Sequence, residues 1–450
     1  MVTVTRRETA RAPIYTLDDV KALSAANDEP VWLRAFRETA WGIYETIPMP
    51  NNKDEDWRRT DLRGVRWAEA GKLVQASGAN ADSVPAAARE PLVGGNEGGT
   101  LIIVDGKVVE YHVSEELTRQ GVIFTDLLTA AREHPTLVEA NLMTKAVKPA
   151  DGKFAALHAA LWTHGIFVYV PRGVVAELPL HAVMYNTKAG ATLGHVLVVV
   201  EDNAQATIQV EYGSADSIEP SLYFGATEIL VGANANLRYV SLQNWNRTTT
   251  EFANHRAKVG ADSSLDWVFG VMGCDLLKNY IDLDADGKGA NGRISGFFFA
   301  DKDQVFDLDT QQNHNAPLTN TDLLFKGAAR DTARTVWQGM IKSLPKMQKI
   351  DGYQANRNLL LSDDARMDGI PGLEIEADDV KCSHAATFGT LEDEPIHYLM
   401  SRGIPRNQAE LMVIDGFFDE LLQRVPFEQV RDRLKGEIEQ KIVGSVGAYD

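Results

Sequence analysis

Cysteine is scarce in this sequence, which has only Cys274 and Cys382 among 450 residues. Two cysteines cannot form a disulfide framework, and their sequence contexts differ, so we expect free thiols and a reducing cytoplasmic compartment. Long apolar runs are missing too, because no segment approaches the roughly 18 uncharged apolar residues of a membrane helix. The first residues, MVTVTRRETARAPIYTL, have no apolar region after their arginines. We therefore expect neither export nor membrane insertion.

Basic residues are also in short supply, with 45 Lys and Arg against 63 Asp and Glu and a formal net charge of −18. This balance argues against a nucleic-acid-binding protein built on a basic face. The phosphate-binding pattern G-x-x-x-x-G-K-[ST], the nucleophile pattern G-x-S-x-G and the zinc pattern H-E-x-x-H are all absent. We expect a chain that is not an enzyme and binds no nucleotide itself.

Helical patterns dominate the first part of the chain, residues 1–165. Thr16 precedes LDDVKALSAAND as a helix cap, and the next helix places four apolar residues on one face, which we interpret as core: Trp32, Phe36, Ala40 and Tyr44. In the charged segment 54–64, we expect Trp57 to be docked and Arg58 and Arg59 to be solvated. Residues 73–99 resemble a linker, and Asp105-Gly106 predicts a hairpin turn. Helical patterns then run to His164, with Gly165 as the expected cap.

From residue 166 to 388 the sequence changes to short strands separated by turn residues. Turns at Glu201-Asp202, Gly232-Ala233, Gly260-Ala261 and Ala285-Asp286 recur about every 25 to 30 residues. A period of this size without helical patterns predicts a parallel β-helix, in which each coil stacks on the next and buries a column of apolar side chains. A jelly roll is the main alternative, because it also has evenly spaced short strands.

Helices return in residues 389–450. Pro395 suits the first turn of one helix, Gly403 ends it, and Pro405 opens the next. The last helix has an apolar stripe at i, i+4 spacing, consisting of Val430, Leu434, Ile438 and Ile442. Such stripes are usually core, although part of this surface could instead dock another protein.

Cys382 and His384 are the candidate metal ligands. In an extended chain, residues i and i+2 project to the same face, so the sulfur and the imidazole should point together. The alternative is that Cys382 is a small buried residue and His384 an ordinary surface or core histidine. The carboxylates upstream, Glu374, Glu376, Asp378 and Asp379, fit a solvated strand end better than a ligand set. An iron-sulfur cluster normally takes about four protein ligands, so any metal centre here would need a second chain.

Longer motifs carry a resemblance that covers nearly the whole chain. They are DWRRTDLR, DLLFKGAARDTARTVWQGMI, NRNLLLSDDA, GLEIEADDVKCSHAATFG and HYLMSRGI, in this order. In these motifs the sequence is similar to the SufD members of the SufB/SufD family of iron-sulfur cluster assembly proteins. The resemblance implies a mainly β fold, with a right-handed parallel β-helix core flanked by N-terminal and C-terminal α-helical regions. It also implies two partners, a SufB-like paralogue on the β-helix and a SufC-like ABC-type ATPase on the C-terminal helices.

The same resemblance implies that clusters are built on the SufB side and that His384 is a ligand or essential group at the shared interface, with Cys382 beside it. The chain would be a non-catalytic scaffold subunit that shares a transient iron-sulfur cluster with its partner and supports cluster assembly and iron acquisition. Without its partner, it could pair with itself through the exposed sheet edge.

Two other functions stay open at this point. A SufB-type scaffold would need a cysteine some 28 residues before the motif histidine and a Glu-His-Glu pattern around it. This chain has Asn356 near the first position and Cys-Ser-His at the second, so SufD fits better. Ala385 and His397 also depart from the usual glycine and phenylalanine, and we expect His397 to be a packing or surface residue. A β-helix carbohydrate-active enzyme is the alternative of a different class, and it would show a groove of carboxylates and aromatic rings.

Overall fold

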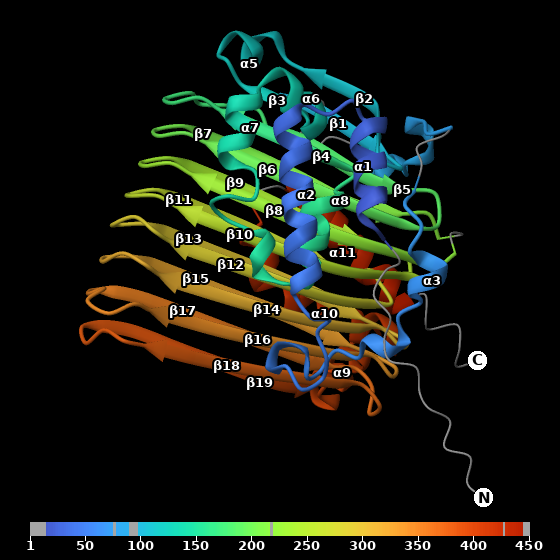
Figure 1. The fold of residues 1–450 in the computed structure, drawn as a ribbon. Coiled ribbons are helices and arrows are strands. Elements are labelled where there is room, and N and C mark those ends of the chain that lie inside the picture. The colour runs from blue at the N-terminus through green and yellow to red at the C-terminus, as the bar shows by residue number, and fades with distance from the viewer. Residues whose placement is uncertain (1–14, 75–77, 90–97, 217–218, 426–427, 444–450) are drawn as a thin grey trace, which may run out of the picture.

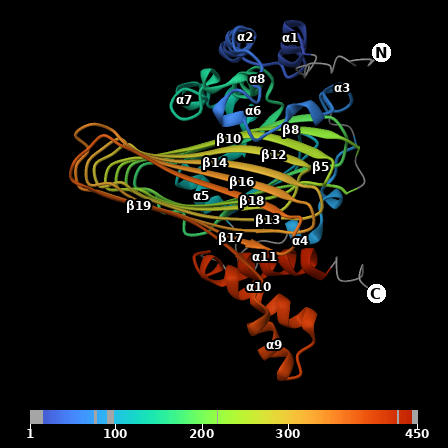
Figure 2. The ribbon, with the colours of Figure 1, turned by 90° about the horizontal axis from the view of Figure 1, so that it is seen from below.

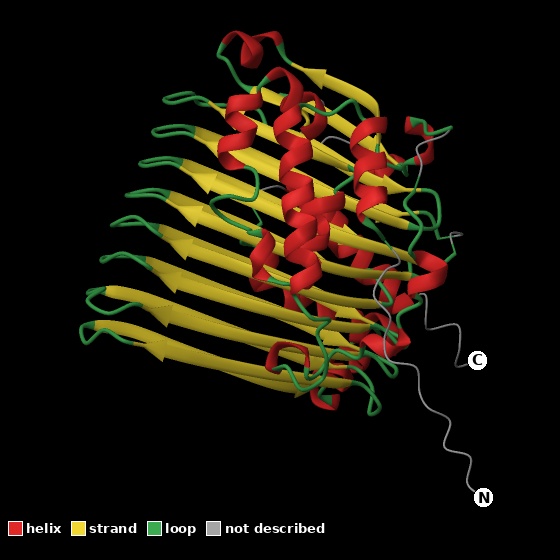
Figure 3. Ribbon diagram, viewed as in Figure 1, coloured by secondary structure: helices red, strands yellow, loops and turns green. Residues whose placement is uncertain are grey.

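The computed structural model describes residues 15–74, 78–89, 98–216, 219–425 and 428–443, and its centre is a stack of strands in two facing sheets (Figures 1 and 3). Sheet A has the strand order β18-β16-β14-β12-β10-β8-β6-β4-β3, and sheet B has the order β19-β17-β15-β13-β11-β9-β7-β5-β1-β2. The chain therefore alternates between the sheets, one strand in each per coil. The strands are β1 (Gly99–Val104), β2 (Lys107–Val113), β3 (Ile123–Asp126), β4 (His164–Val170), β5 (Leu180–Asn186), β6 (Ala191–Val200), β7 (Gln205–Ser214), β8 (Ser221–Val231), β9 (Asn236–Asn244), β10 (Thr249–Val259), β11 (Ser264–Val271), β12 (Leu276–Ala285), β13 (Asn291–Ala300), β14 (Val305–His314), β15 (Asn320–Ala329), β16 (Arg334–Ser343), β17 (Ile350–Leu360), β18 (Arg366–Ile375) and β19 (Val380–Thr390).

Successive coils are stacked in parallel and in register. Thr250 of β10 pairs with Leu276 of β12, and Arg334 of β16 pairs with Arg366 of β18, so the coils take between 26 and 32 residues. The parallel pairing confirms the predicted β-helix and excludes the jelly roll, whose strands are antiparallel. The predicted turns lie between strand ends, where Asn203 and Asn234 adopt positive φ angles of 60° and 55°. Asn tolerates this left-handed region, and Asn234 Nδ2 donates a 2.8 Å hydrogen bond to Asn203 Oδ1 of the preceding coil.

The interior between the two sheets, which we call the lumen, holds the largest apolar cluster of the protein. Its members come from both sheets and include the fully buried Ile166, Val196, Trp267, Leu323 and Phe325. Each coil alone could not bury these side chains, so the stacking of neighbours provides the driving force for the fold.

Helices cover the outer faces of both sheets, with the N-terminal helices on sheet A and the C-terminal helices on sheet B (Figure 2). None of the helices in the described residues is both long and apolar enough to cross a membrane. The α-helices are α1 (Leu17–Ala26), α2 (Val31–Thr46), α3 (Trp67–Ala70), α4 (Ala86–Arg89), α5 (Glu115–Arg119), α6 (Leu127–Glu133), α7 (Pro135–Asn141), α8 (Lys153–Leu161), α9 (Asp393–Ser401), α10 (Arg406–Leu422) and α11 (Glu428–Val443), and the 3-10 turns are η1 (Glu55–Trp57), η2 (Leu62–Gly64), η3 (Ala81–Ser83) and η4 (Pro149–Asp151).

In the N-terminal part, the local predictions are largely confirmed. Thr16 forms a complete capping box with Asp19 at the start of α1, and Asp105-Gly106 turns the chain between β1 and β2. Ala40 and Tyr44 are core residues of α2, whereas Trp32 and Phe36 are only partly buried against that core. The predicted linker, residues 73–99, contains η3 and α4, while 75–77 and 90–97 lie outside the described residues.

Two predictions in this part are wrong. Gly165 does not cap a helix, because α8 ends at Leu161 and β4 begins at His164; a methyl group on Gly165 would lie 2.4 Å from the carbonyl oxygen of His195. The close approach of a neighbouring strand therefore explains this glycine. Arg59 is not simply solvated either, since its Nη1 donates a 3.0 Å hydrogen bond to Gln338 Oε1 on β16. Trp57 is docked as expected, against Phe154.

At the other end of the chain, α10 and α11 pack on sheet B. The predicted stripe Val430, Leu434, Ile438 and Ile442 is buried there with Phe297 and Phe299 of β13. This apolar face of α11 is therefore core and is not free to dock a partner. Gly403 ends α9 with a φ of +86°, as predicted, and Pro405 precedes α10.

The two ends of the β-helix differ. At the N-terminal end, the antiparallel strands β2 and β3 lie outside β1 and β4 and cover the first coil. At the C-terminal end, β18 and β19 each have a neighbour on one side only among the strands of the described residues. The last coil thus presents two unpaired strand edges and the open mouth of the lumen.

Candidate functional site

The candidate ligands Cys382 and His384 both lie on β19, the terminal strand of sheet B. In the parallel ladder, Cys382 pairs with Gly352 and His384 pairs with Gln354. The same ladder continues from Gln354 to Leu323 on β15, which is a fully buried member of the lumen cluster. Because in-register neighbours face the same way, Cys382 and His384 extend columns of lumen-facing side chains to the open end.

Cys382 and His384 are more exposed than the side chains beneath them in the lumen. Cys382 is half-buried and His384 is exposed, because no further coil of the described residues covers this end. Phe388 and Leu373, which belong to the same last coil, are large apolar residues with 47% and 40% of their surface exposed. Exposed apolar side chains at two unpaired strand edges favour association with another chain.

The thiol of Cys382 is held in its protonated form. Burial raises its pKa, and the negative charge of Asp351 adds to this effect, while the backbone of Gly352 lowers the pKa in part. A thiolate is the form that binds iron, so the sulfur would need a metal ion or a cationic group from another chain to lose its proton.

Within the described ranges, no three His, Cys, Asp or Glu side chains are grouped so that they could hold a metal ion. Glu374, Glu376, Asp378 and Asp379 are all exposed around the turn between β18 and β19, and Glu374 forms a 2.6 Å ion pair with Lys342. These carboxylates are thus the solvated strand end that we expected. His397 is exposed on α9.

Beneath the two candidate ligands, the lumen is polar. Gln354, Asn356 and Asn358 of β17 face the interior where the coil below carries Leu323, Phe325 and Gly327. All three β17 side chains are buried, and Gln354 Oε1 and Asn356 Nδ2 have no hydrogen-bond partner. Of these three residues, only Asn356 stood out in the sequence, as the residue near the SufB cysteine position. The coil period could have found all three, because residues 354, 356 and 358 lie 30 positions before their partners 384, 386 and 388.

Cys274, the other cysteine, lies far from this site in the turn between β11 and β12. It is free and fully buried, with a φ of 102°. Gln243 Nε2 lies 2.9 Å from its sulfur, and the thiol donates a 3.6 Å hydrogen bond to Glu251 Oε2. Burial raises the pKa of this thiol strongly, so Cys274 is an inert side chain of the lumen.

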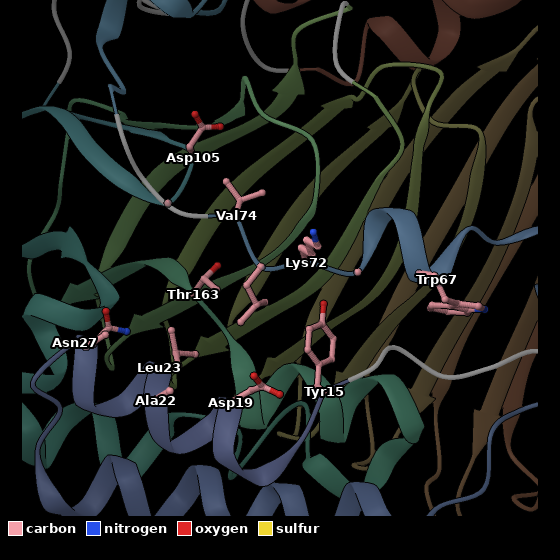
Figure 4. Close-up of a pocket in the computed structure, with 15 residues that line it drawn as sticks. Tyr15, Asp19, Ala22, Leu23, Asn27, Trp67, Lys72, Val74, Asp105 and Thr163 are labelled. Carbon is pink, nitrogen blue, oxygen red and sulfur yellow. The ribbon is translucent and has the colours of Figure 1, made fainter.

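Several concave features lie elsewhere on the described part of the protein. A cavity of about 860 Å³ between α1, α3 and the β1–β2 turn is lined by Tyr15, Asp19 and Trp67 (Figure 4), at the opposite end of the sheets from β19. A groove of about 680 Å³ crosses β7 to β15, and no aromatic ring lines it. Its carboxylates Asp266 and Asp322 are paired with Arg293 and Arg424. This groove therefore has no aromatic ring, whereas a smaller pocket of about 330 Å³ is lined by aromatic rings and carboxylates, among them Trp57, Tyr280, Asp56 and Asp282.

Protein-family models match both the N-terminal region and the β-helix core of this chain. The family model for the SufBD core domain of the SUF system of Fe-S cluster assembly matches residues 183–417, and that for the SufBD N-terminal region matches residues 18–182. An iron-sulfur cluster assembly protein SufD of Bacillus subtilis is 33% identical over 94% of this chain and 97% of its own length. Iron-sulfur cluster assembly SufBD family proteins of Staphylococcus haemolyticus and Staphylococcus epidermidis are each 27% identical over 95% of this chain and 93% of theirs. The chain belongs to the SufB/SufD family of iron-sulfur cluster assembly proteins.

Proposed function

We propose that this chain is a SufD-type, non-catalytic scaffold subunit of a cytoplasmic SUF complex, and that it helps a SufB-like paralogue to assemble iron-sulfur clusters. The observation that carries the proposal is the asymmetry of the β-helix. Its N-terminal end is covered by antiparallel strands, while its C-terminal end leaves two strand edges unpaired next to Cys382 and His384. Unpaired edges are a ready template for a second chain.

The incomplete ligand set supports the same assignment. Cys382 and His384 supply two of the roughly four ligands of an iron-sulfur cluster, and the carboxylates nearby are solvated. A partner β-helix joined at this end would bring its own ligands to the same place. The cluster is then a transient cargo shared between the two chains, with His384 as the principal contribution of this chain and Cys382 as the second. In the absence of its partner, the chain would use the same edges to form a homodimer.

The C-terminal helices are the proposed docking site for a SufC-like ATPase, which would hydrolyse ATP in place of this chain. The exposed large apolar residues there are Tyr398 and Met400 of α9 and Met412 of α10, which are 60%, 38% and 50% exposed. Buried contacts tie α10 and α11 to sheet B, so movement of the helices would be transmitted to the coils. We also propose that the chain is divided into an N-terminal mainly helical region, residues 1–165, a β-helix core, residues 166–388, and a C-terminal helical domain, residues 389–450.

The test replaces His384 by alanine in the full chain and reconstitutes the complex with its SufB-like and SufC-like partners under anaerobic conditions. We expect the complex to form and cluster maturation to stop, because His384 is exposed and contributes little to folding. Cys382→Ser is the companion variant, and Cys274→Ser controls for the loss of a thiol. Normal maturation with His384→Ala would remove His384 from the mechanism. A stoichiometric cluster on the isolated wild-type chain would refute the shared site.

A further inference from the structure

Asn356 is a fully buried side chain with an unused hydrogen-bond donor, and it lies one coil below the last strand, beneath Ala386 and next to the residue beneath His384. It is 0% exposed, and its Nδ2 has no hydrogen-bond partner among the described residues. Burial of an amide N–H group without a partner costs on the order of 1–3 kcal/mol, so an unsatisfied donor in a lumen calls for an explanation.

The orientation of this amide is determined by its neighbour. Asn358 Nδ2 donates to Asn356 Oδ1 over 2.5 Å and approaches the carbonyl oxygen of Thr387 at 3.3 Å. The carbonyl can only accept, so Asn358 must present its NH₂ group here, and Asn356 must in turn present its oxygen to that NH₂ group. Rotating the Asn356 amide by half a turn would place two donors against each other. The free group of Asn356 is therefore an N–H donor.

Asn356 belongs to the layer immediately below the mouth of the lumen. It pairs in register with Ala386, the lumen-facing residue that follows His384 on β19. A methyl group on Gly369 of β18 would lie 3.0 Å from Asn356 Oδ1, 3.0 Å from Phe388 Cζ and 3.1 Å from Ala386 Cβ. Asn356 Oδ1, Ala386 Cβ and Phe388 Cζ thus surround one point of the lumen in the last coil. Phe388 is 47% exposed, so this layer reaches the surface at the open end.

The geometry points to Asn356 as a further binding residue of the site, one whose Nδ2–H group donates a hydrogen bond to an anionic sulfur of the cargo, either a sulfide or a cluster-bound thiolate. This inference rests on the proposed function, since it presupposes an iron-sulfur cargo at Cys382 and His384. Amide N–H groups withdraw electron density from cluster sulfurs and raise the reduction potential. The Asn356 amide is suited to this role, because its hydrogen bond with Asn358 fixes the amide orientation before any cargo binds.

The experiment uses the reconstituted complex of the full chain with its SufB-like and SufC-like partners, loaded anaerobically. Asn356→Leu removes the donor and keeps the branched shape of the side chain, and Asn356→Ser restores a donor. Gln312→Leu is the comparison variant, because Gln312 is a buried lumen amide on β14 with an unpartnered Oε1, whose Nε2 already donates to the carbonyl of Tyr353. The reduction potential of the bound cluster is measured by redox titration for all of them, and thermal unfolding reports on the fold.

We expect the Asn356→Leu complex to carry a cluster of lower potential than the wild type, the Asn356→Ser complex to recover part of the shift, and the Gln312→Leu complex to match the wild type. Equal potentials for Asn356→Leu and Gln312→Leu would overturn the inference. If Asn356→Leu prevents folding, the comparison of Asn356→Ser and Asn356→Asp, a donor against an acceptor, decides instead. A His384→Ala complex that loads normally would refute the proposed function itself, whereas failed loading there with an unchanged potential in Asn356→Leu would refute only the role of Asn356.

Discussion

Replacing Glu228 by glutamine should stabilise the folded chain at neutral pH. His158 Nδ1 lies 3.2 Å from the carbonyl oxygen of Phe224, which can only accept, so this nitrogen carries the proton and Nε2 is the acceptor. His195 Nδ1, 3.0 Å from His158 Nε2, must then be the donor. The lone pair of His195 Nε2 consequently faces Glu228 Oε2 at 3.3 Å. A neutral carboxyl can donate to that lone pair, whereas a carboxylate cannot.

The magnitude follows from the ionisation of Glu228, which is fully buried on the outer face of sheet A. Burial raises its pKa to about 8, although the backbone N–H groups of Met143 and Val147 act in the opposite direction. The unfolded chain has a carboxyl pKa near ~4.3, so between about pH 4.3 and pH 8 it releases a proton that the folded chain keeps. The free energy of unfolding therefore falls by about 1.4 kcal/mol per pH unit in this window. By pH 7 the loss amounts to about 3–4 kcal/mol.

Glutamine cannot ionise. Its Nε2 can donate to His195 while its oxygen accepts from the backbone N–H of Val147, at the cost of the hydrogen bond from the Met143 N–H, which contacts the same carboxyl oxygen as His195. Urea unfolding followed by circular dichroism at pH 5, 6, 7 and 8 should show Glu228→Gln gaining on the wild type with each step. Glu211→Gln is the matched control with the opposite sign, because ion pairs with His181 and Arg433 lower the pKa of Glu211 despite its burial.

Two results would refute this reasoning. If Glu228→Gln were less stable than the wild type at pH 8, the ionised carboxylate would be the stabilising form. If the two proteins lost stability in parallel as the pH rose from 5 to 8, Glu228 would not be the group that takes up the proton. Glu211→Gln shows how much stability is lost when a buried, ion-paired glutamate is replaced, so that a general cost of the substitution can be told apart from an effect of the Glu228 charge.

Three further predictions concern stability and thiol chemistry. Lys278→Met should lower the free energy of unfolding by about 3–5 kcal/mol, because the fully buried ammonium group pairs with Asp307 at 3.0 Å and its loss leaves buried carboxylates without a counter-charge. An unchanged midpoint of urea unfolding would contradict this. Leu434→Ala should cost about 2–5 kcal/mol and expose α11 to limited proteolysis, since Leu434 is 0% exposed in the core with sheet B; wild-type protease resistance would count against it. Iodoacetamide should modify Cys382 only slowly at neutral pH and faster under alkaline conditions, and should leave Cys274 unmodified until the chain unfolds; rapid native labelling of Cys274, followed by mass spectrometry, would disprove its burial.

Local chemistry explains which structural features could be predicted from the residues alone. The capping box at Thr16, the turn at Asp105-Gly106 and the stop at Gly403 each depend on neighbours within a few positions, and all are present. The β-helix was predictable for a related reason, since stacked coils repeat their turn residues at similar intervals, here 26 to 32 residues. Gly165 shows the limit of such reasoning, because its cause is a strand from the next coil and not the helix before it.

The sequence by itself determined a repeating β architecture with helical ends, two free thiols and a Cys-x-His pair whose side chains share one face. Only the tertiary structure decided that this pair extends the lumen to its open end, that the stripe on α11 is core, and that Gln354 lies beneath His384 with Asn356 beneath Ala386. The physical reason is that these relations depend on which residues of successive coils pair and on where the stack of coils ends. Paired residues of successive coils lie about 30 positions apart in the sequence, which is beyond the reach of any local pattern.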